Sequence, residues 1–277
     1  MLSKEQLESG IKELPPLPAA IAEILAALNK KNVAIEFLMS KIIQDPALSS
    51  KVLSLANSPF YGMSGNIASI NDACVVLGMH TLRNIAMAVG VAGNYPADSG
   101  NYIDIGGLWQ HAIGTAVAAR VLALECRVDQ ELAFTTGLLH DIGKMVIDQC
   151  FPDENEQTLK TSKADDCLLF EAERKLLGVD HGEVGAMVAR RWNLPDAIVD
   201  ALHNHHSTDV SKRSKLIDLI TVADIVSRGL EIGNPGDDLI PSLEADMLER
   251  LGLDMAIIIE HLPEIDELSR SSDSLFN

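Results

Sequence analysis

Apolar residues recur at steps of three and four along most of this chain. Leu38, Ile42 and Ile43 form one such stripe, and Leu48 and Val52 begin the next. In an α-helix this spacing places the apolar side chains on one face, where they can pack against other helices. Apolar residues make up 47% of the chain and aromatic residues only 4%, so aliphatic side chains must fill the core. We therefore predict an all-α fold, with an amino-terminal helical bundle packed on a second helical core.

Start and stop signals agree with these helices. Asp45 precedes Pro46, which places a capping residue before a proline at the first helical position. Ser69 opens another helix, and Gly62 and Gly78 mark helix ends. In the rest of the chain the apolar pattern predicts helices at about 108–126, 129–148, 165–177, 181–192, 195–204, 215–230, 242–250 and 254–269.

Two runs of turn-forming residues divide the chain. The first lies between residues 94 and 107, the second between residues 231 and 238, and both are rich in glycine and aspartate or asparagine. These runs predict an amino-terminal helical subdomain at 1–98, a second helical subdomain at 99–238 and a carboxy-terminal helical extension at 239–277.

The charge of the chain argues against several kinds of partner. Its 40 Asp and Glu residues outnumber 22 Lys and Arg residues, so the net charge is −18 with neutral histidines. Nucleic acids and anionic membranes are held mainly by Lys and Arg, so we expect neither as a partner. No apolar stretch approaches the ~18 residues of a membrane span, and the four cysteines form no Cys-x-x-Cys pair. Reduced thiols and a cytoplasmic location are the expectation.

Six of the eight histidines fall between residues 111 and 206, together with carboxylates inside apolar helices. His140 and Asp141 interrupt the apolar run 137–147. An unpaired charge buried there would cost several kcal/mol, so Asp141 needs a cation. Lys144, three residues later, is one candidate, and a metal ion with His140 as the neighbouring ligand is the other. These residues alone do not decide between the two candidates.

His111 and Asp224 are placed in a similar way. His111 lies near the start of a helix rich in alanine and glycine, which lets a neighbouring helix come close enough for side chains to converge. Asp224 is a carboxylate within the apolar run 222–226. Taken singly, each is more often a hydrogen-bonded core residue than a metal ligand.

Three further histidines lie at predicted helix ends. Asp180 is typical of a cap for a helix that would begin at His181. The positive end of the helix dipole disfavours imidazolium, so we expect a neutral His181 that can bind a metal. His205 and His206 follow the helix that begins near Pro195, where the alternative is a solvated cluster that caps the helix.

The order of His111, His140-Asp141 and Asp224 resembles the HD superfamily of metal-dependent phosphohydrolases. Within it the chain resembles the HDOD domain family, through many short motifs that follow that family's order. The motifs are Leu14-Pro15-Pro16-Leu17-Pro18, Asp45-Pro46-Ala47-Leu48, Leu55-Ala56-Asn57-Ser58, Tyr61-Gly62, Ile67 to Ile70, Leu77-Gly78, Gly137-Leu138-Leu139-His140-Asp141-Ile142-Gly143-Lys144 and Trp192-Asn193-Leu194-Pro195. The resemblance implies an all-helical module of bacterial signalling proteins that is usually regarded as non-catalytic.

With the related HD-GYP phosphodiesterases as a guide, the resemblance also implies a complete set of metal ligands. Asp141 would bridge two ions and Lys144 would face the phosphate, and these two would be the catalytic residues of an active enzyme. The implied ligands are His111, His140, Asp141 and Asp224 for one ion, and Asp141, His181, His205 and His206 for the other. Mixed imidazole and carboxylate ligands suit one or two divalent ions of Fe, Mn, Ni or Zn.

Two features depart from the HD-GYP pattern. Gly107 stands where some of those enzymes carry an extra ligating glutamate, and no Gly-Tyr-Pro occurs in the chain. Hydrolysis of a cyclic dinucleotide is therefore not expected.

Three functional hypotheses remain. The first is a regulatory module that keeps the metal site and has signalling proteins as partners. The second is an active metal-dependent phosphohydrolase that acts on a small phosphorylated ligand. The third is a metal-free helical scaffold whose histidines are ordinary core and capping residues. The HDOD pattern of the amino-terminal half, which carries no evident chemistry, favours the first.

Overall fold

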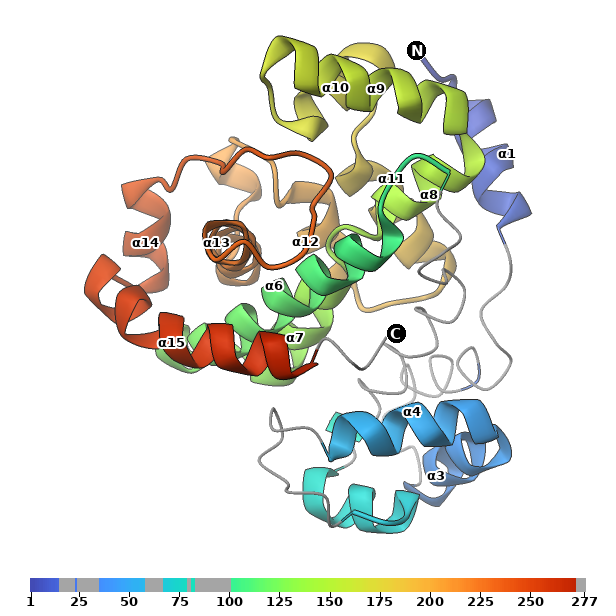
Figure 1. Ribbon diagram of the computed structural model, residues 1–277, viewed down its shortest axis with the longest axis vertical. Helices are drawn as coiled ribbons and strands as arrows, with labels where there is room; N and C mark the ends of the chain where they lie inside the picture. Colours follow the sequence, from blue (N-terminus) through green and yellow to red (C-terminus); the bar gives the residue numbers. More distant parts are fainter. Residues whose placement is uncertain (15–22, 24–34, 58–66, 79–80, 83–100, 273–277) are drawn as a thin grey trace.

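The computed structural model describes residues 1–14, 23, 35–57, 67–78, 81–82 and 101–272 (Figure 1). Every regular element in these ranges is helical, which confirms the all-α prediction. The helices are α1 (Lys4–Glu13), α3 (Ile35–Gln44), α4 (Pro46–Ala56), α6 (Ile105–Cys126), α7 (Gln130–Leu139), α8 (Ile142–Cys150), α9 (Pro152–Asp165), α10 (Leu169–Leu176), α11 (His181–Arg191), α12 (Asp196–Asn204), the short 3-10 helix η2 (Val210–Lys212), α13 (Lys215–Gly229), α14 (Ala245–Leu251) and α15 (Met255–Ser272).

The predicted capping signals of the amino-terminal part are confirmed. Asp45 Oδ1 accepts a hydrogen bond from the Leu48 amide at 3.0 Å, and α4 begins at Pro46. Ser69 Oγ accepts one from the Asp72 amide at 3.1 Å, at the start of a helix over residues 70–78. Gly78, the last described residue of that helix, has a left-handed φ of 78° that suits glycine. The predicted end at Gly62 and motif residues 15–18, 58 and 61 lie outside the described residues.

The long helix α6 is the centre of the second part, and α7, α13 and α15 pack against it. Its small residues allow the close approach that the sequence predicted. A Cβ atom at Gly137 of α7 would lie only 2.8 Å from the Ala116 Cα of α6. Because the two backbones are nearly in contact, side chains from α6 and from the end of α7 reach the same space.

The single helix predicted at 129–148 is wrong, because the chain turns at His140 and Asp141. Helix α7 ends at Leu139 and α8 begins at Ile142. Asp141 has φ −99° and ψ 9°, and its side chain makes no capping hydrogen bond to α8. A Cβ atom at Gly143 would overlap the His181 carbonyl oxygen, so α8 lies directly against the start of α11. The turn thus leaves the Asp141 carboxylate available to other partners.

Helix α9 was not predicted. It begins at a proline and is polar along most of its length, so it lacks the apolar stripe by which the other helices were found. Its buried residues are themselves polar, namely Asn155, Thr158 and Ser162. Where burial relies on polar side chains, hydrophobic periodicity cannot reveal the helix.

The two ends of the described chain both pack against this second part. Helix α1 packs on α8 and α11, and the Leu2 amide donates to the Leu177 carbonyl at 2.8 Å. Helices α14 and α15 pack on α13 and α6. The boundaries at 98 and 238 stay predictions.

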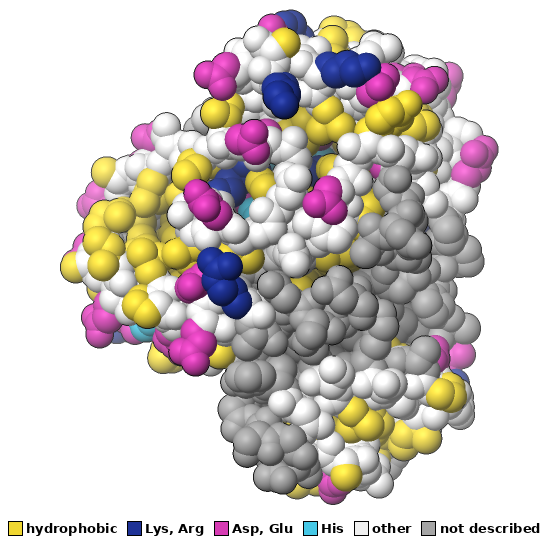
Figure 2. Space-filling view, in the orientation of Figure 1, with side chains coloured by type: hydrophobic (Ala, Val, Ile, Leu, Met, Phe, Trp, Pro, Cys, Tyr) yellow, Lys and Arg dark blue, Asp and Glu magenta, His cyan; other side chains and the backbone are white. Residues whose placement is uncertain are grey.

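Acidic side chains are spread over the face drawn in Figure 2, and apolar side chains gather where α14 lies. Among the helices that the structure describes, none is both long enough and apolar enough to cross a bilayer.

Candidate metal centre

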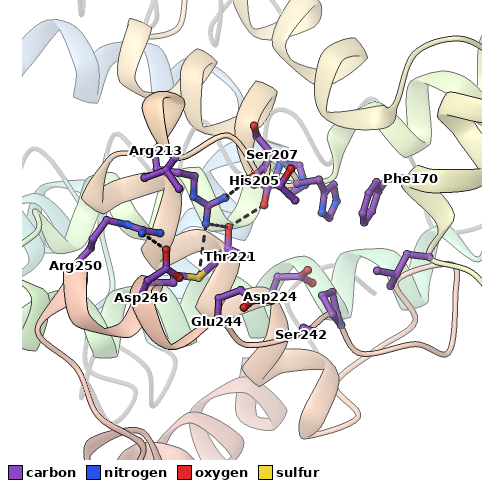
Figure 3. Close-up of a pocket in the computed structure, with 16 residues that line it drawn as sticks. Phe170, His205, Ser207, Arg213, Thr221, Asp224, Ser242, Glu244, Asp246 and Arg250 are labelled. Atoms are coloured by element: carbon purple, nitrogen blue, oxygen red, sulfur yellow. Dashed lines mark hydrogen bonds and ion pairs between the residues drawn. The ribbon is translucent and has the colours of Figure 1, made fainter.

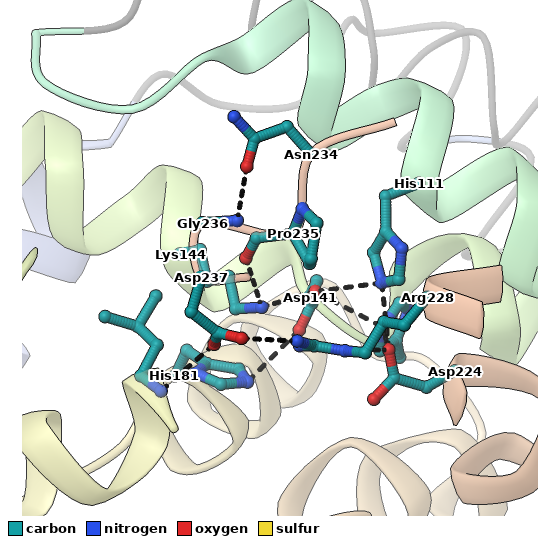
Figure 4. Close-up of polar contacts among 12 residues, drawn as sticks. His111, Asp141, Lys144, His181, Asp224, Arg228, Asn234, Pro235, Gly236 and Asp237 are labelled. Carbon is teal, nitrogen blue, oxygen red and sulfur yellow. Dashed lines mark hydrogen bonds and ion pairs between the residues drawn. The ribbon is translucent and has the colours of Figure 1, made fainter. Parts of the chain in front are cut away.

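All seven predicted ligands converge at one place in the helical core. Figure 3 labels His205 and Asp224 among them, and Figure 4 labels His111, Asp141, His181 and Asp224. They come from α6, the α7–α8 turn, the start of α11, the end of α12 and α13. The ligand atoms form two groups, and within each group all the atoms lie within 4.8 Å of one another. The Asp224 group consists of His111, His140 and Asp224, and the Asp141 group consists of Asp141, His181, His205 and His206. All are buried except His206, which is half-buried.

The Asp224 group directs two imidazoles toward one carboxylate oxygen. Asp224 Oδ1 lies 3.0 Å from His111 Nε2 and 3.9 Å from His140 Nε2. His140 Nδ1 donates to the Gly137 carbonyl at 2.6 Å, and His111 Nδ1 lies 3.3 Å from Ser227 Oγ. Because the Nδ1 atoms have partners, the Nε2 lone pairs remain for a ligand in the centre.

The Asp141 group has the same construction. Asp141 Oδ1 lies 3.1 Å from His181 Nε2 and 3.9 Å from His205 Nε2. His205 Nδ1 donates to the Leu202 carbonyl at 2.7 Å, and His206 Nε2 lies 2.9 Å from His181 Nε2. The His206 ring stacks on Phe170, with centroids 4.3 Å apart.

Asp141 also reaches the Asp224 group. Its second oxygen, Oδ2, lies 3.3 Å from His140 Nε2 and 3.6 Å from His111 Nε2. One carboxylate thus faces both groups, as the resemblance implied for a bridging ligand.

The atoms of this centre fit a divalent cation. Three buried imidazole atoms that make no hydrogen bond belong to it, namely His111 Nε2, His140 Nε2 and His205 Nε2. Each such atom costs about 1–3 kcal/mol when it is left unsatisfied. Lone pairs of neutral imidazoles and carboxylates repel one another at these distances, and a cation between them removes the repulsion. The ligand types are those of Fe, Mn, Ni or Zn sites.

Burial keeps most of the imidazoles ready for a metal. It lowers the pKa of His111 and of His206, and it lowers the pKa of His205 to about 3, helped by the neighbouring His140 and His181. These three rings are therefore neutral at pH 7, which is the form that binds metal ions.

His181 corrects a prediction, because without a metal it is protonated rather than neutral. Asp180 caps α11 as expected and His181 is the first helical residue. Burial acts to lower its pKa, but the buried Glu173 carboxylate, 2.6 Å from Nδ1, and Asp141 together raise the pKa to about 9. The charges of two carboxylates outweigh the helix dipole. Sequence reasoning missed Glu173, since an acidic residue in an amphipathic helix carries no signal of burial.

Two further cations stand beside the carboxylates. Lys144 Nζ donates to Asp141 Oδ2 at 2.6 Å, so one of the two cations considered for Asp141 is present in the structure. Arg228 Nε donates to Asp224 Oδ1 at 2.8 Å, and sequence reasoning missed it although it follows Asp224 by one helical turn. Burial opposes ionisation, yet the neighbouring histidines and Lys144 hold the pKa of Asp141 well below its usual range. Arg228 and His111 do the same for the pKa of Asp224. Both carboxylates are ionised at pH 7.

The family follows from a direct comparison with known proteins. The HDOD domain family model matches residues 14–208. The chain belongs to the HDOD family. An uncharacterised protein of Treponema pallidum is 29% identical over 84% of the chain, and ribonuclease Y of Lactobacillus gasseri is 30% identical over 42% of the chain. The chain spans 46% of the first relative and 16% of the second.

Solved structures of similar proteins share the whole HDOD fold. An HDOD domain protein of unknown function from Geobacter sulfurreducens is 27% identical, with TM-score 0.83 over 98% of this chain and 96% of that one. A protein of Shewanella amazonensis provisionally named a phosphohydrolase is 28% identical, with TM-score 0.81 over 98% of each chain. One of Marinobacter aquaeolei provisionally named a signal transduction protein is 25% identical, with TM-score 0.78 over 99% of this chain and 65% of that one.

This HDOD chain has no room for the extra glutamate of the HD-GYP pattern. A Cβ atom at Gly107 would lie 2.8 Å from the Asn234 Cβ, and the Gly107 amide already donates to Asp104 Oδ1 at 2.9 Å. The segment after α13, predicted only as a break between helices, thus passes close to the centre.

A cavity of about 560 Å³ lies beside the centre (Figure 3). Its lining includes Asp224 and the ligands His205 and His206. Two arginines, Arg213 and Arg250, also line it, but their Nε atoms donate to the two oxygens of Asp218 at 2.6 and 2.7 Å. The exposed Arg190 and Arg191 at the end of α11 are not part of the lining. A small molecule in this cavity would directly contact residues of both candidate ligand groups.

Proposed function

We propose that this HDOD chain is a regulatory signalling module that binds one or two divalent ions of Fe, Mn, Ni or Zn in the Asp141 and Asp224 groups. The observation that carries the proposal is the set of three buried imidazole Nε2 atoms, of His111, His140 and His205, that make no hydrogen bond and face the carboxylates of Asp141 and Asp224. The similarity to the Marinobacter protein, at 25% identity, supports the signalling role. Signalling proteins would be its partners.

Different side chains would hold the two ions. His111, His140 and Asp224 would hold one ion, while His181, His205 and His206 would hold a second, and Asp141 would serve both. Glu173 and the carbonyls behind the imidazoles orient the rings. A bound divalent ion would act as a Lewis acid on a phosphoryl oxygen and lower the pKa of water.

Metal analysis tests this function. Protein purified without added metal is analysed for Fe, Mn, Ni and Zn, and again after reconstitution with each ion and removal of the excess. We expect one to two equivalents after reconstitution and thermal stabilisation by the same ion, because binding to the folded state alone stabilises it. Less than about one-tenth of an equivalent in every case contradicts the proposal and leaves the metal-free scaffold.

A second candidate is a metal-dependent phosphohydrolase that acts on a small phosphorylated ligand. The cavity favours it, because its ~560 Å³ suits a small ligand and its wall includes three metal ligands. Since Asp218 already pairs with Arg213 and Arg250, a phosphate there would depend on bound ions and on Lys144 for positive charge. The 28% identity to the Shewanella protein adds support.

Turnover of phosphomonoesters, phosphodiesters and a panel of nucleotides by the reconstituted protein tests this candidate. Activity that needs the ion and is lost in Asp141→Asn supports an enzyme. No turnover by fully loaded protein leaves the regulatory module. RNA cleavage belongs in the panel because of the ribonuclease Y relatives, but the net charge of −18 leads us to expect none.

A further inference from the structure

The segment 233–239, here named the strap, crosses the metal centre between α13 and α14 (Figure 4). It is attached on two sides. The Asn234 amide donates to the Gly107 carbonyl of α6 at 2.8 Å, and the Leu169 amide of α10 donates to Asp237 Oδ2 at 3.0 Å. At Gly233, with φ 69°, a Cβ atom would overlap the His111 amide nitrogen, so only glycine permits this approach to α6.

Two buried cations connect the strap to the metal ligands. Lys144 Nζ donates to Asp141 Oδ2 at 2.6 Å and to the Pro235 carbonyl at 2.8 Å. Arg228 is the other cation. Its Nε donates to Asp224 Oδ1 at 2.8 Å, while its Nη1 donates to Asp237 Oδ1 at 2.6 Å and to the Leu239 carbonyl at 2.8 Å. Each cation therefore joins one ligand carboxylate to the strap.

These cations approach the same oxygen atoms as the histidines do. Asp224 Oδ1 lies 2.8 Å from Arg228 Nε and 3.0 Å from His111 Nε2. Asp141 Oδ2 lies 2.6 Å from Lys144 Nζ and 3.3 Å from His140 Nε2. An ion held between each histidine and its carboxylate would therefore compete for the oxygen and repel the cation beside it.

We propose that the strap responds to metal occupancy, being held closed in the metal-free protein and loosened when ions bind at Asp141 and Asp224. The proposal rests on the proposed function, since it requires that the centre binds an ion. Its physical basis is that the ion replaces Lys144 and Arg228 as the charge partner of the ligand carboxylates. The strap then loses the hydrogen bonds that it accepts from Lys144 and Arg228.

The position of the strap gives this response a consequence for the cavity. Pro241, Ser242 and Glu244, just after the strap, line the cavity wall. Lys144 is only 1% exposed while the strap is closed. Loosening the strap would change that wall and free Lys144 from Pro235 to face a ligand. Metal occupancy would thereby be converted into a change of surface that a partner or a ligand can detect.

Hydrogen–deuterium exchange on the full chain tests the proposal, with bound Mn²⁺, Ni²⁺ or Zn²⁺ measured on the same samples. We expect strap amides to exchange at least about fivefold faster in the loaded protein, a coupling at the lower end of the usual range, while amides of α6 and α7 exchange more slowly. Loaded protein with unchanged or slower strap exchange overturns the proposal and leaves the proposed function intact. Absence of binding by these three ions and by Fe²⁺ overturns both.

A pair of variants tests the reverse coupling. Asp237→Asn weakens the anchor to Arg228, and Asp238→Asn removes the same charge one residue along, from an exposed side chain. Because coupling is reciprocal, Asp237→Asn should speed strap exchange without metal and raise ion affinity about fivefold relative to Asp238→Asn. Equal affinities in the two variants, or an Asp237→Asn strap that exchanges like the wild type, overturn the proposal.

Discussion

The Asp224 group and the Asp141 group share a construction but differ in which side chains balance their charge. Asp224 is paired with Arg228, whose pKa the neighbouring carboxylates raise further, so that cation never loses its proton. Asp141 is paired with Lys144 and with the protonated imidazole of His181, whose pKa is raised to about 9. An ion that binds at Asp141 can displace the His181 proton into solvent, whereas an ion that binds at Asp224 requires the Arg228 guanidinium to move.

This difference in charge balance predicts which group binds an ion first. In the Asp141 group a metal ion exchanges with one proton, and the half-buried His206 lies beside the cavity. In the Asp224 group the ion must share Asp224 Oδ1 with Arg228. We therefore expect the first ion at the Asp141 group and a weaker second ion at the Asp224 group.

The largest expected effect is that of Asp141→Asn, which removes the one carboxylate shared by both groups. We expect affinity for the first ion to fall by at least about 1,000-fold, or roughly 4 kcal/mol, and the second ion to be lost. Metal content and calorimetric titration measure this. Because the change also leaves Lys144 buried beside a neutral amide, the circular dichroism spectrum must be shown to match that of the wild type. Retention of two ions would contradict the bridging role of Asp141.

Glu173→Gln should act on only one of the two groups. It removes the carboxylate that orients His181, which typically costs about 10- to 100-fold in metal affinity. The first ion should weaken by that amount while the second is little changed, as two-site titration would show. The same variant should lower the pKa of His181, measured by NMR in the metal-free protein. Equal weakening at both sites would mean that the groups do not act separately.

The pH dependence of ion binding tests whether a proton on His181 balances the charge of the Asp141 group. Without metal, His181 is protonated below about pH 9, and its Nε2 must lose that proton to bind an ion. Affinity for the first ion should therefore rise about tenfold per pH unit from pH 7 to pH 9 and level off above it. Titration in buffers of different ionisation enthalpy should register about one proton released at pH 7.5. Affinity independent of pH would contradict a protonated His181.

The smallest effect is expected within the histidine cluster at the end of α12. His203 is the neighbour of two ligands in sequence but belongs to neither ligand group. His203→Gln should leave metal stoichiometry unchanged and affinity within about twofold, since no ligand is removed. The matched change His206→Gln should weaken the first ion. Equal effects of the two changes would place the cluster outside the metal site.

Local sequence signals predicted a large part of this centre. The caps at Asp45, Ser69 and Asp180 depend on residues three apart, so pattern reasoning could find them. The ligand set was found because histidines and carboxylates inside apolar helices are rare and match a known family. Helix α9 and the turn at Asp141 were missed, because their features depend on buried polar groups and on close packing against α11.

Sequence patterns alone identified a helical protein of the HDOD family and the side chains that form the two candidate ligand groups. The balance of charge among those side chains depends on contacts that form in the folded protein. Glu173, Arg228 and the strap act through contacts between different helices, some of which join residues far apart in the chain, such as Lys144 and Pro235. The pKa of a buried group depends on every charge around it in space, and the order of residues along the chain does not contain that information.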